Sequence, residues 1–222
     1  PCNYPRTGGY GVCARHTDAL GRIDIAGAPS NPNVIYAQVG SIEWNNNGGC
    51  GNTTGCQLGV WSSTNAGTTW SFMDGSAGGA LRNCSAGQGD YPQNWYDQGM
   101  AVDPNNPDRI LIDTFDVWLA SRPGTSFSDL NCGYSGGNVV HVDQHALAFV
   151  PGSSSILLKG SDGGAFSSSN ADTAVIGTTR NTWVNMDNGI NTIEFYSGDI
   201  SGSFATSANP QAVGGAQANS PT

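Results

Sequence analysis

The chain has 222 residues, of which 32 are Gly and 11 are Pro, only 11% are charged, and the formal net charge is −9. This acidic balance argues against a protein that binds nucleic acid or an anionic membrane surface, because both kinds of binding depend on Lys and Arg. No apolar run approaches the ~20 residues of a membrane helix, so we expect no membrane-spanning segment, while 37% hydrophobic residues suffice for a packed core.

Short runs rich in β-branched and aromatic residues, separated by clusters of Gly, Asn, Ser and Pro, predict strands along the whole chain. No long stretch has the i, i+3, i+4, i+7 spacing of an amphipathic helix. In chain order the expected strands are Val34–Val39, Gly59–Ser62, Arg109–Ile112, Val139–Val142, Ser155–Lys159 and Gln211–Val213. The sequence therefore predicts an all-β fold.

An internal repeat groups these strands into units. Residues 28–36 and 103–111 each place a Pro-x-Asn-Pro turn between two strands, and looser copies follow at 150–157 and 208–213. Pro fixes φ and Asn tolerates turn conformations, so each string makes a tight antiparallel reversal. Apart from a longer first interval, the spacing fits the roughly 40–50 residues of a four-stranded propeller blade. We expect a β-propeller of four-stranded antiparallel blades, with about four blades near 16–73, 95–130, 139–186 and 190–222 and insertions near 43–57 and 74–94.

A second repeated turn occupies residues 63–70. In it, the Asn65 side chain should cap turn amides, Gly67 should take a positive φ, and Trp70 should pack between blades. The string, which begins at Ser63, resembles the Asp-box pattern Ser/Thr-x-Asp-x-Gly-x-x-Trp/Phe, with Asn65 in the place of the Asp. Degraded copies lie at 168–184 and 121–127.

Together with the strings at 143–147, 160–166 and 183–190, these turns resemble Asp-box (BNR-repeat) β-propellers of the sialidase-like group. Sortilin-type and xyloglucanase-type propellers and the photosystem II assembly-factor propellers are the most similar. The resemblance covers most of residues 16–219 and specifies architecture better than chemistry. Because members of that group usually have more blades, it implies an open, partial propeller that belongs to a larger chain or assembly.

The six cysteines contain no CxxC pair, which favours disulfides over a zinc site and predicts an oxidising compartment. We therefore expect a secreted or cell-surface protein. Other connectivities stay open, but bridging between near neighbours gives Cys2–Cys13, Cys50–Cys56 and Cys84–Cys132.

The innermost strand of each propeller blade borders the central axis, where loops at one mouth form the usual site. Asp97, Asp143 and Glu194 are the candidate axial carboxylates. Two of them within about 5–10 Å of each other could serve as acid and as nucleophile or base in glycoside hydrolysis. The alternative is that these groups satisfy backbone hydrogen bonds at the crowded centre.

His141, Asp143 and His145 alternate, so on a strand all three would point to one face. That arrangement could supply two imidazoles and a carboxylate to a metal ion, and the alternative is a structural polar stripe. No other cofactor is expected.

Ligand contacts are expected from two groups of residues. Arg22, Gln98 and Tyr196 enter innermost strands, and Trp44 and Trp95 lie in or near the insertions. Flat aromatic faces beside amide side chains suit carbohydrate stacking or protein contact, although each Trp could instead pack under its own loop.

Three functions remain open. The chain could be an extracellular propeller that binds glycan or protein, a fragment of a secreted glycoside hydrolase that uses axial carboxylates, or a repeating subunit of an extracellular assembly. The expected partners are carbohydrate, an extracellular protein, further copies of the chain, or the remainder of a larger chain. A sialidase is disfavoured because the seven scattered arginines form no evident cluster for a substrate carboxylate.

Overall fold

The computed structural model describes residues 20–41, 57–74, 94, 96–123, 127–131, 140–173, 182–190, 195–202 and 204–216. The chain divides into two compact units, Pro1–Met186 and Asp187–Thr222, which are described separately. The cysteines, Trp44, Trp95 and Glu194 lie outside the described residues. No helix in the described ranges has the length and apolar character needed to cross a bilayer.

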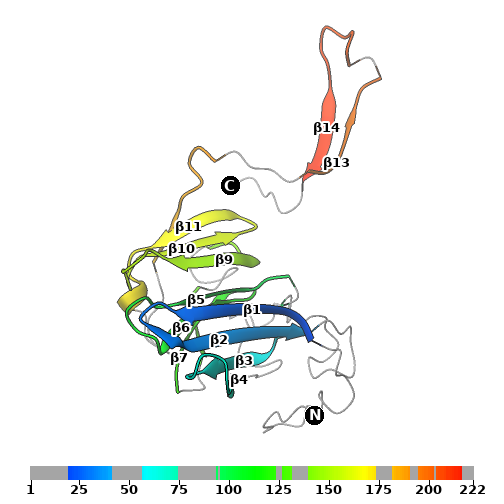
Figure 1. Ribbon diagram of the computed structural model, residues 1–222. Helices are drawn as coiled ribbons and strands as arrows, with labels where there is room; N and C mark the ends of the chain where they lie inside the picture. Colours follow the sequence, from blue (N-terminus) through cyan, green and yellow to red (C-terminus); the bar gives the residue numbers. More distant parts are fainter. Residues whose placement is uncertain are drawn as a thin grey trace. The chain divides into compact units, whose positions relative to one another are not determined.

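The first unit contains three four-stranded antiparallel sheets, each built from strands in sequence order (Figure 1). Blade 1 consists of β1 (Leu20–Ala28), β2 (Asn31–Ser41), β3 (Gln57–Ser63) and β4 (Ser71–Asp74). Blade 2 consists of β5 (Gly99–Val102), β6 (Arg109–Asp113), β7 (Val117–Ser121) and β8 (Phe127–Asp129). Blade 3 consists of β9 (Gln144–Phe149), β10 (Leu157–Ser161), β11 (Gly164–Ser168) and β12 (Trp183–Asn185). In each sheet, neighbouring strands are consecutive in the sequence and antiparallel, as in propeller blades, so the predicted fold class is confirmed. The sheets remain open.

The second unit is a hairpin of β13 (Phe195–Ile200) and β14 (Ala212–Ala216). It has the order of the first two strands of a blade. The Asp199 carboxylate accepts the N–H of Ile200 at 2.8 Å, as the Asp24 carboxylate accepts the N–H of Ile25 at 3.0 Å in β1.

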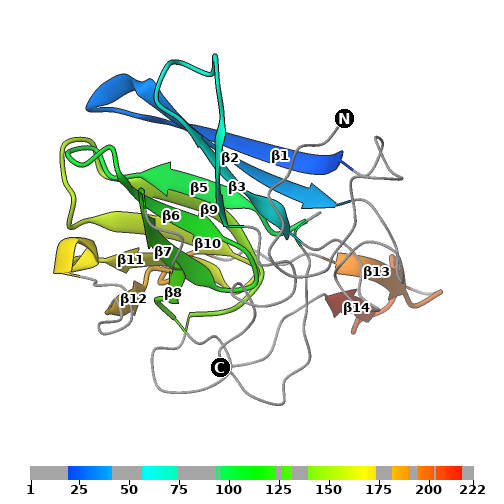
Figure 2. The same cartoon turned by 90° about the horizontal axis from the view of Figure 1, so that it is seen from below.

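Blade 2 lies between blades 1 and 3, and its strands are apolar on both faces (Figure 2). Ile110 and Ile112 pack toward blade 1, whereas Leu111, between them in the sequence, packs toward blade 3. Successive residues of a strand point to opposite faces, so a strand covered on both sides reads as a continuous apolar run. This is why β6 is buried over its whole length.

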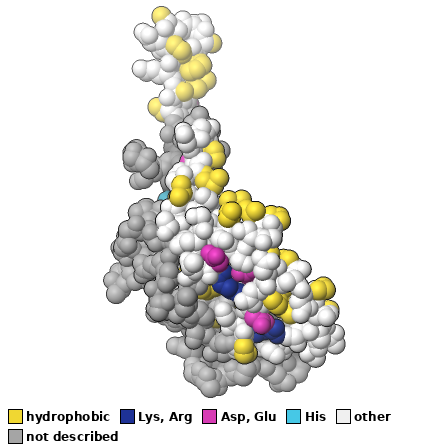
Figure 3. All heavy atoms as spheres, turned by 90° about the vertical axis from the view of Figure 1, so that its left-hand side faces the viewer, with side chains coloured by type: hydrophobic (Ala, Val, Ile, Leu, Met, Phe, Trp, Pro, Cys, Tyr) yellow, Lys and Arg dark blue, Asp and Glu magenta, His cyan; other side chains and the backbone are white. Residues whose placement is uncertain are grey.

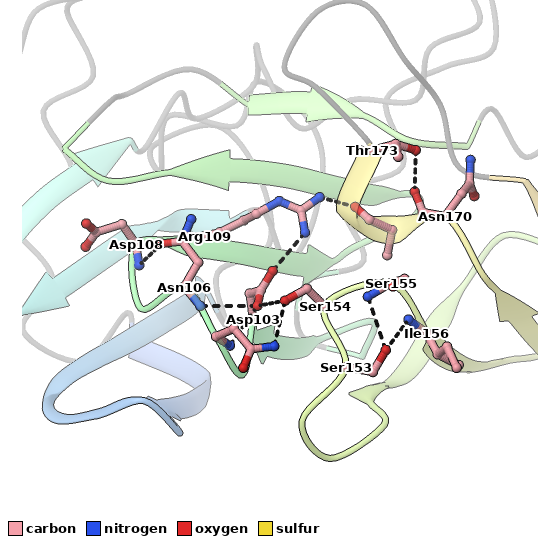
Figure 4. Close-up of polar contacts among 12 residues, drawn as sticks. Asp103, Asn106, Asp108, Arg109, Ser153, Ser154, Ser155, Ile156, Asn170 and Thr173 are labelled. Atoms are coloured by element: carbon pink, nitrogen blue, oxygen red, sulfur yellow. Dashed lines mark hydrogen bonds and ion pairs between the residues drawn. The ribbon is translucent and has the colours of Figure 1, made fainter.

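Polar contacts tie the turn between β5 and β6 to blade 3 (Figure 4). The Asp103 carboxylate accepts the Ser154 hydroxyl at 2.6 Å and pairs with the buried Arg109 guanidinium at 3.2 Å. Arg109 also donates to the carbonyl of Ala171, and the Asn105 amide donates to the Ser154 hydroxyl at 3.0 Å. The Asp103 carboxylate further accepts the N–H of Asn105 at 2.9 Å, so one side chain both shapes the expected turn and joins two blades.

The described surface carries few charges. On the face in Figure 3, most side chains are uncharged, and the cations lie beside carboxylates. Among the described residues, Arg122 pairs with Asp108, which follows the Asn-Pro turn.

The turn after β3 has the expected local contacts. The Asn65 side chain accepts the N–H of Thr69 at 2.8 Å, the Ser63 hydroxyl accepts the N–H of Gly67 at 2.9 Å, and Gly67 has a φ of 84°. Trp70, however, is 41% exposed and lies against Gly67, so the expectation that it packs between blades is wrong.

Two strand boundaries also differ from expectation. Residues 140–142, expected in a strand, precede β9, which begins only at Gln144, and the strand expected from Ser155 begins at Leu157. Asp143 has a φ of 60°, in the left-handed region, and an extended strand cannot run through such a residue. The residues before β9 therefore form a turn.

Candidate functional site

Acid and base side chains gather where the chain enters the inner strands β5 and β9. The inner strands are neighbours, since β5 lies beside both β1 and β9. Asp97 precedes β5, Asp143 precedes β9, His145 lies in β9, and Asp162 lies in the turn between β10 and β11. We call these four residues the axial cluster.

His145 lies between two carboxylates of the cluster. Its Nε2 atom is 2.5 Å from Oδ1 of Asp162, and its Nδ1 atom is 3.9 Å from Oδ1 of Asp97. The Tyr96 ring meets the imidazole edge-on, with ring centroids 4.8 Å apart. The short contact with Asp162 and the packing of Tyr96 fix the orientation of the imidazole.

Asp97 is the most deeply buried member of the cluster. Its side chain is fully buried, and neither carboxylate oxygen has a hydrogen-bond donor among the described residues. Burial, followed by the negative charge of Asp143, raises the pKa of Asp97 to about 9. Because burial and a neighbouring negative charge both disfavour the ionised form, Asp97 is protonated at neutral pH.

Asp143, which is half-buried, is the carboxyl group next to the protonated Asp97. Burial and the neighbouring charge of Asp162 raise its pKa, whereas its interaction with Asp97 and the charges of His141 and His145 lower it. Asp143, Asp162 and His145 are each partly exposed, so a molecule at the surface can reach them but not Asp97. The cluster thus combines a buried proton with an accessible carboxyl group.

The backbone at Asp143 is held from both sides. Its N–H donates to the carbonyl of Phe115 at 3.2 Å, and its own carbonyl accepts the N–H of Asp162 at 3.2 Å. The next residue, Gln144, donates its N–H to the Thr114 carbonyl at 3.2 Å. A non-glycine residue with a φ of 60° costs on the order of 1–3 kcal/mol, so these contacts stabilise a conformation that the chain alone disfavours.

Arg22 and Gln98, expected to bind a ligand, instead bind each other's backbone. Arg22 donates to the carbonyls of Tyr96 and, at 3.1 Å, of Gln98, while the Gln98 amide donates to the carbonyl of Arg22 at 3.3 Å. These contacts fasten β1 to the segment that carries Asp97. The positive charge of Arg22 also opposes, as a smaller effect, the rise in the pKa of Asp97.

The metal site expected at His141, Asp143 and His145 does not form. Within the described residues, no group of three or more His, Cys, Asp or Glu side chains could hold a metal ion. The expectation required a continuous strand, whereas the positive φ of Asp143 interrupts the alternation. His145 pairs with Asp162, and Nδ1 of His141 lies 3.0 Å from the carbonyl of Val142.

Two of the expected axial carboxylates, Asp97 and Asp143, therefore come together, while Glu194 lies outside the described residues. Tyr196 belongs to β13 in the second unit, and nothing is described of its side chain. Asp162 was missed, because its Gly-rich string from Gly160 to Gly164 indicated only a tight turn. Such a turn is present, and the missed signal was an acidic residue at its tip.

A pocket of about 460 Å³ lies at the other end of the inner strands. Its lining, mostly apolar, consists of Ala26, Gly27, Pro29, Met100, Ala101, Val102, Pro104, Phe149, Pro151 and Gly152. None of these side chains titrates, so the lining of this pocket supplies no acid or base.

No protein-family model matches the chain, and no curated protein matches it. Among solved structures, the chain is similar to the GH74 enzyme of Niastella koreensis, with a TM-score of 0.45 and 14% sequence identity. The match covers 79% of this chain and 25% of that chain. The chain thus spans a quarter of the length of that enzyme.

Proposed function

We propose that the chain is part of a glycoside hydrolase of the β-propeller type, and that the axial cluster supplies its acid–base chemistry. The observation that carries this proposal is the fully buried carboxyl group of Asp97 beside the half-buried Asp143, an arrangement that keeps Asp97 protonated. Groups whose environments hold them in different protonation states are those that can divide the roles of acid and base.

The chemistry assigns a separate part to each carboxyl group. Asp143 receives the proton of Asp97 and donates it to the glycosidic oxygen as the bond from that oxygen to the sugar carbon breaks. Asp162, on the far side of the His145 ring from Asp97, then accepts the proton of the water that attacks the sugar carbon.

A specific observation favours a second function, the binding of a glycan without cleavage. Tyr96 is 39% exposed and stands beside His145, where its aromatic face can stack on a sugar ring. In that case the buried Asp97 would serve only to order the rim of the site.

The setting belongs to the same proposal. An extracellular location, disulfides among the six cysteines, and further blades from a larger chain or from additional copies are proposed from the sequence. The assignment of the turn at residues 63–70 to the Asp-box type is likewise proposed, and it is supported by the contacts of Ser63 and Asn65.

The test is the release of new reducing ends from a panel of soluble β-glucans that includes xyloglucan. Asp143→Asn and Asp162→Asn should each lower the rate by about 10²–10⁴-fold, the range for loss of a general acid or base. Asp172→Asn, an exposed carboxyl outside the cluster, is the matched control and should leave the rate unchanged.

Equal activity of Asp143→Asn and wild type would overturn the role of the cluster. Absence of new reducing ends on every glucan would overturn the hydrolase, and retained binding that depends on Tyr96 would then support the second function.

A further inference from the structure

Lys159 is the one lysine among the 222 residues, and it is buried. It lies in β10, and its side chain is directed toward the junction of blades 2 and 3, with 3% of the residue exposed. A buried amine is costly unless it makes specific contacts. The contacts of Lys159 therefore indicate what the amine does.

The hydrogen bond of Lys159 leads to the turn that carries Asp143. Its Nζ atom donates to the carbonyl of His141 at 3.3 Å, and the Gln144 side chain donates to the same carbonyl at 2.7 Å. The Gln144 amide also donates to the carbonyl of Phe115 in blade 2 at 3.0 Å. Two buried side chains thus converge on one carbonyl two residues before Asp143.

The charges that face Lys159 come from three segments. They are Asp113 at the end of β6, Asp116 in the following turn, and Asp143 itself. Asp113 is fully buried, and neither of its carboxylate oxygens has a donor within the described part of the chain. Burial lowers the pKa of Lys159 to about 7, and these three carboxyl groups oppose that change.

Two aromatic rings close the remaining side of the amine. Nζ lies 5.7 Å from the ring centroids of both Phe166 and Trp183. The rings favour the charged form and shield it from water. The amine is consequently fixed between blade 2, the turn before β9 and the outer strands of blade 3.

We propose that Lys159 is a positioning residue for Asp143: it holds the turn of residues 141–143 through the His141 carbonyl and is electrostatically linked to the Asp143 carboxyl group. The importance of this link for catalysis rests on the proposed hydrolase function, whereas the link itself does not. Lys159 does not touch a substrate, and it acts through the turn.

The single lysine allows a direct measurement on the full chain. Lysine labelled with ¹³C at Cε gives one side-chain resonance, and its pH titration in wild type should contain a second inflection where Asp143 titrates. Asp143→Asn should remove that inflection, and the matched control Asp172→Asn should retain it. A lysine titration curve unchanged by Asp143→Asn would overturn the proposal.

A second set of variants separates positioning from general support of the junction. Lys159→Met should raise the titration midpoint of the Asp143 carboxyl carbon, because a nearby cation is lost. Lys159→Arg should restore the wild-type midpoint. Arg109→Met removes a second buried cation between blades 2 and 3, one that contacts Asp103 and Ala171, and should leave Asp143 unchanged.

Equal effects of Lys159→Met and Arg109→Met on Asp143 would overturn the proposal. If Lys159→Met does not fold, the lysine titration of the wild type and of Asp143→Asn decides alone. If cleavage of a glucan needs Asp143 but the Lys159 titration does not respond to Asp143→Asn, this inference is wrong and the proposed function stands. If the Lys159 titration responds but no glucan is cleaved, the proposed function is wrong and this inference stands.

Discussion

The buried carboxyl group of Asp97 faces the half-buried carboxyl group of Asp143, and each residue lies just before the first strand of its blade, in two neighbouring blades. Each precedes a buried Gln, Gln98 and Gln144, so the pair repeats in the sequence. The repeat of the blade thus places two equivalent carboxyl groups side by side, where they titrate as a coupled pair.

The buried proton of Asp97 makes stability depend on pH. The pKa of Asp97 is raised to about 9 in the folded chain, against an ordinary value of ~3.9 when unfolded, so the folded state binds the additional proton between these values. The contribution of this proton to the free energy of unfolding is therefore fully present below the unfolded pKa of ~3.9. It is lost as the pH rises from there to about 9, by at most about 1.4 kcal/mol per pH unit.

Asp97→Asn, which has no proton to lose, should show a weaker decline of the free energy of unfolding with pH. Urea denaturation of wild type and variant across the window provides the measurement. Parallel pH profiles would contradict the assignment of a buried proton to Asp97.

His145 should matter through its contact with Asp162. His145→Ala removes the imidazole that lies 2.5 Å from Asp162 and packs against Tyr96, so turnover of a responsive glucan should fall, though less than in Asp143→Asn. His145→Gln keeps a donor toward Asp162 and should recover part of the loss. A rate that is the same for Ala, Gln and His at this position would show that the imidazole has no such role.

The turn between β10 and β11 should tolerate no side chain at Gly163. A Cβ atom at that position would lie 2.1 Å from Cβ of His141, so Gly163→Ala must displace the turn before β9 and should cost about 1–3 kcal/mol. Gly27→Ala is the control, because a Cβ atom there meets nothing within 4 Å. The comparison is made by thermal unfolding, and similar melting temperatures for the two variants would refute the contact.

The packing of blade 2 predicts matched losses on its two faces. Ile110 and Leu111 are fully buried against blades 1 and 3 respectively, so Ile110→Ala and Leu111→Ala should each lower the free energy of unfolding by about 2–5 kcal/mol. Ile25→Ala, at a residue that is 63% exposed, should change it by less than about 0.5 kcal/mol. Urea denaturation tests the series, and a small loss at either buried position would contradict the placement of that face.

Local signals in the sequence were sufficient to predict an all-β fold of four-stranded antiparallel sheets. Pro and Asn between alternating strands fix hairpin reversals within a few residues, and the turns at Asp103 and Asn65 form with side-chain contacts of the expected kind. The alignment of Asp97 with Asp143 also follows from the repeat, because equivalent positions of adjacent blades lie side by side.

Contacts between blades could not be predicted in the same way. The positive φ of Asp143 depends on carbonyl groups of residues 114 and 115, and nothing near Asp143 in the sequence indicates them. The metal site was predicted from alternation that this residue interrupts. Asp162 and Lys159 reach the site only after the strands of blade 3 have paired, so their roles depend on tertiary structure.

The protonation state of Asp97 tests the account most directly, and it needs no substrate. We would follow the carboxyl ¹³C resonances of aspartate in the full chain against pH, with Asp97→Asn to assign the signal. The account predicts that Asp97 titrates with a midpoint of about 9. A midpoint near the ordinary ~3.9 would show that no proton is held between Asp97 and Asp143 at neutral pH, and it would contradict the acid–base role of the cluster.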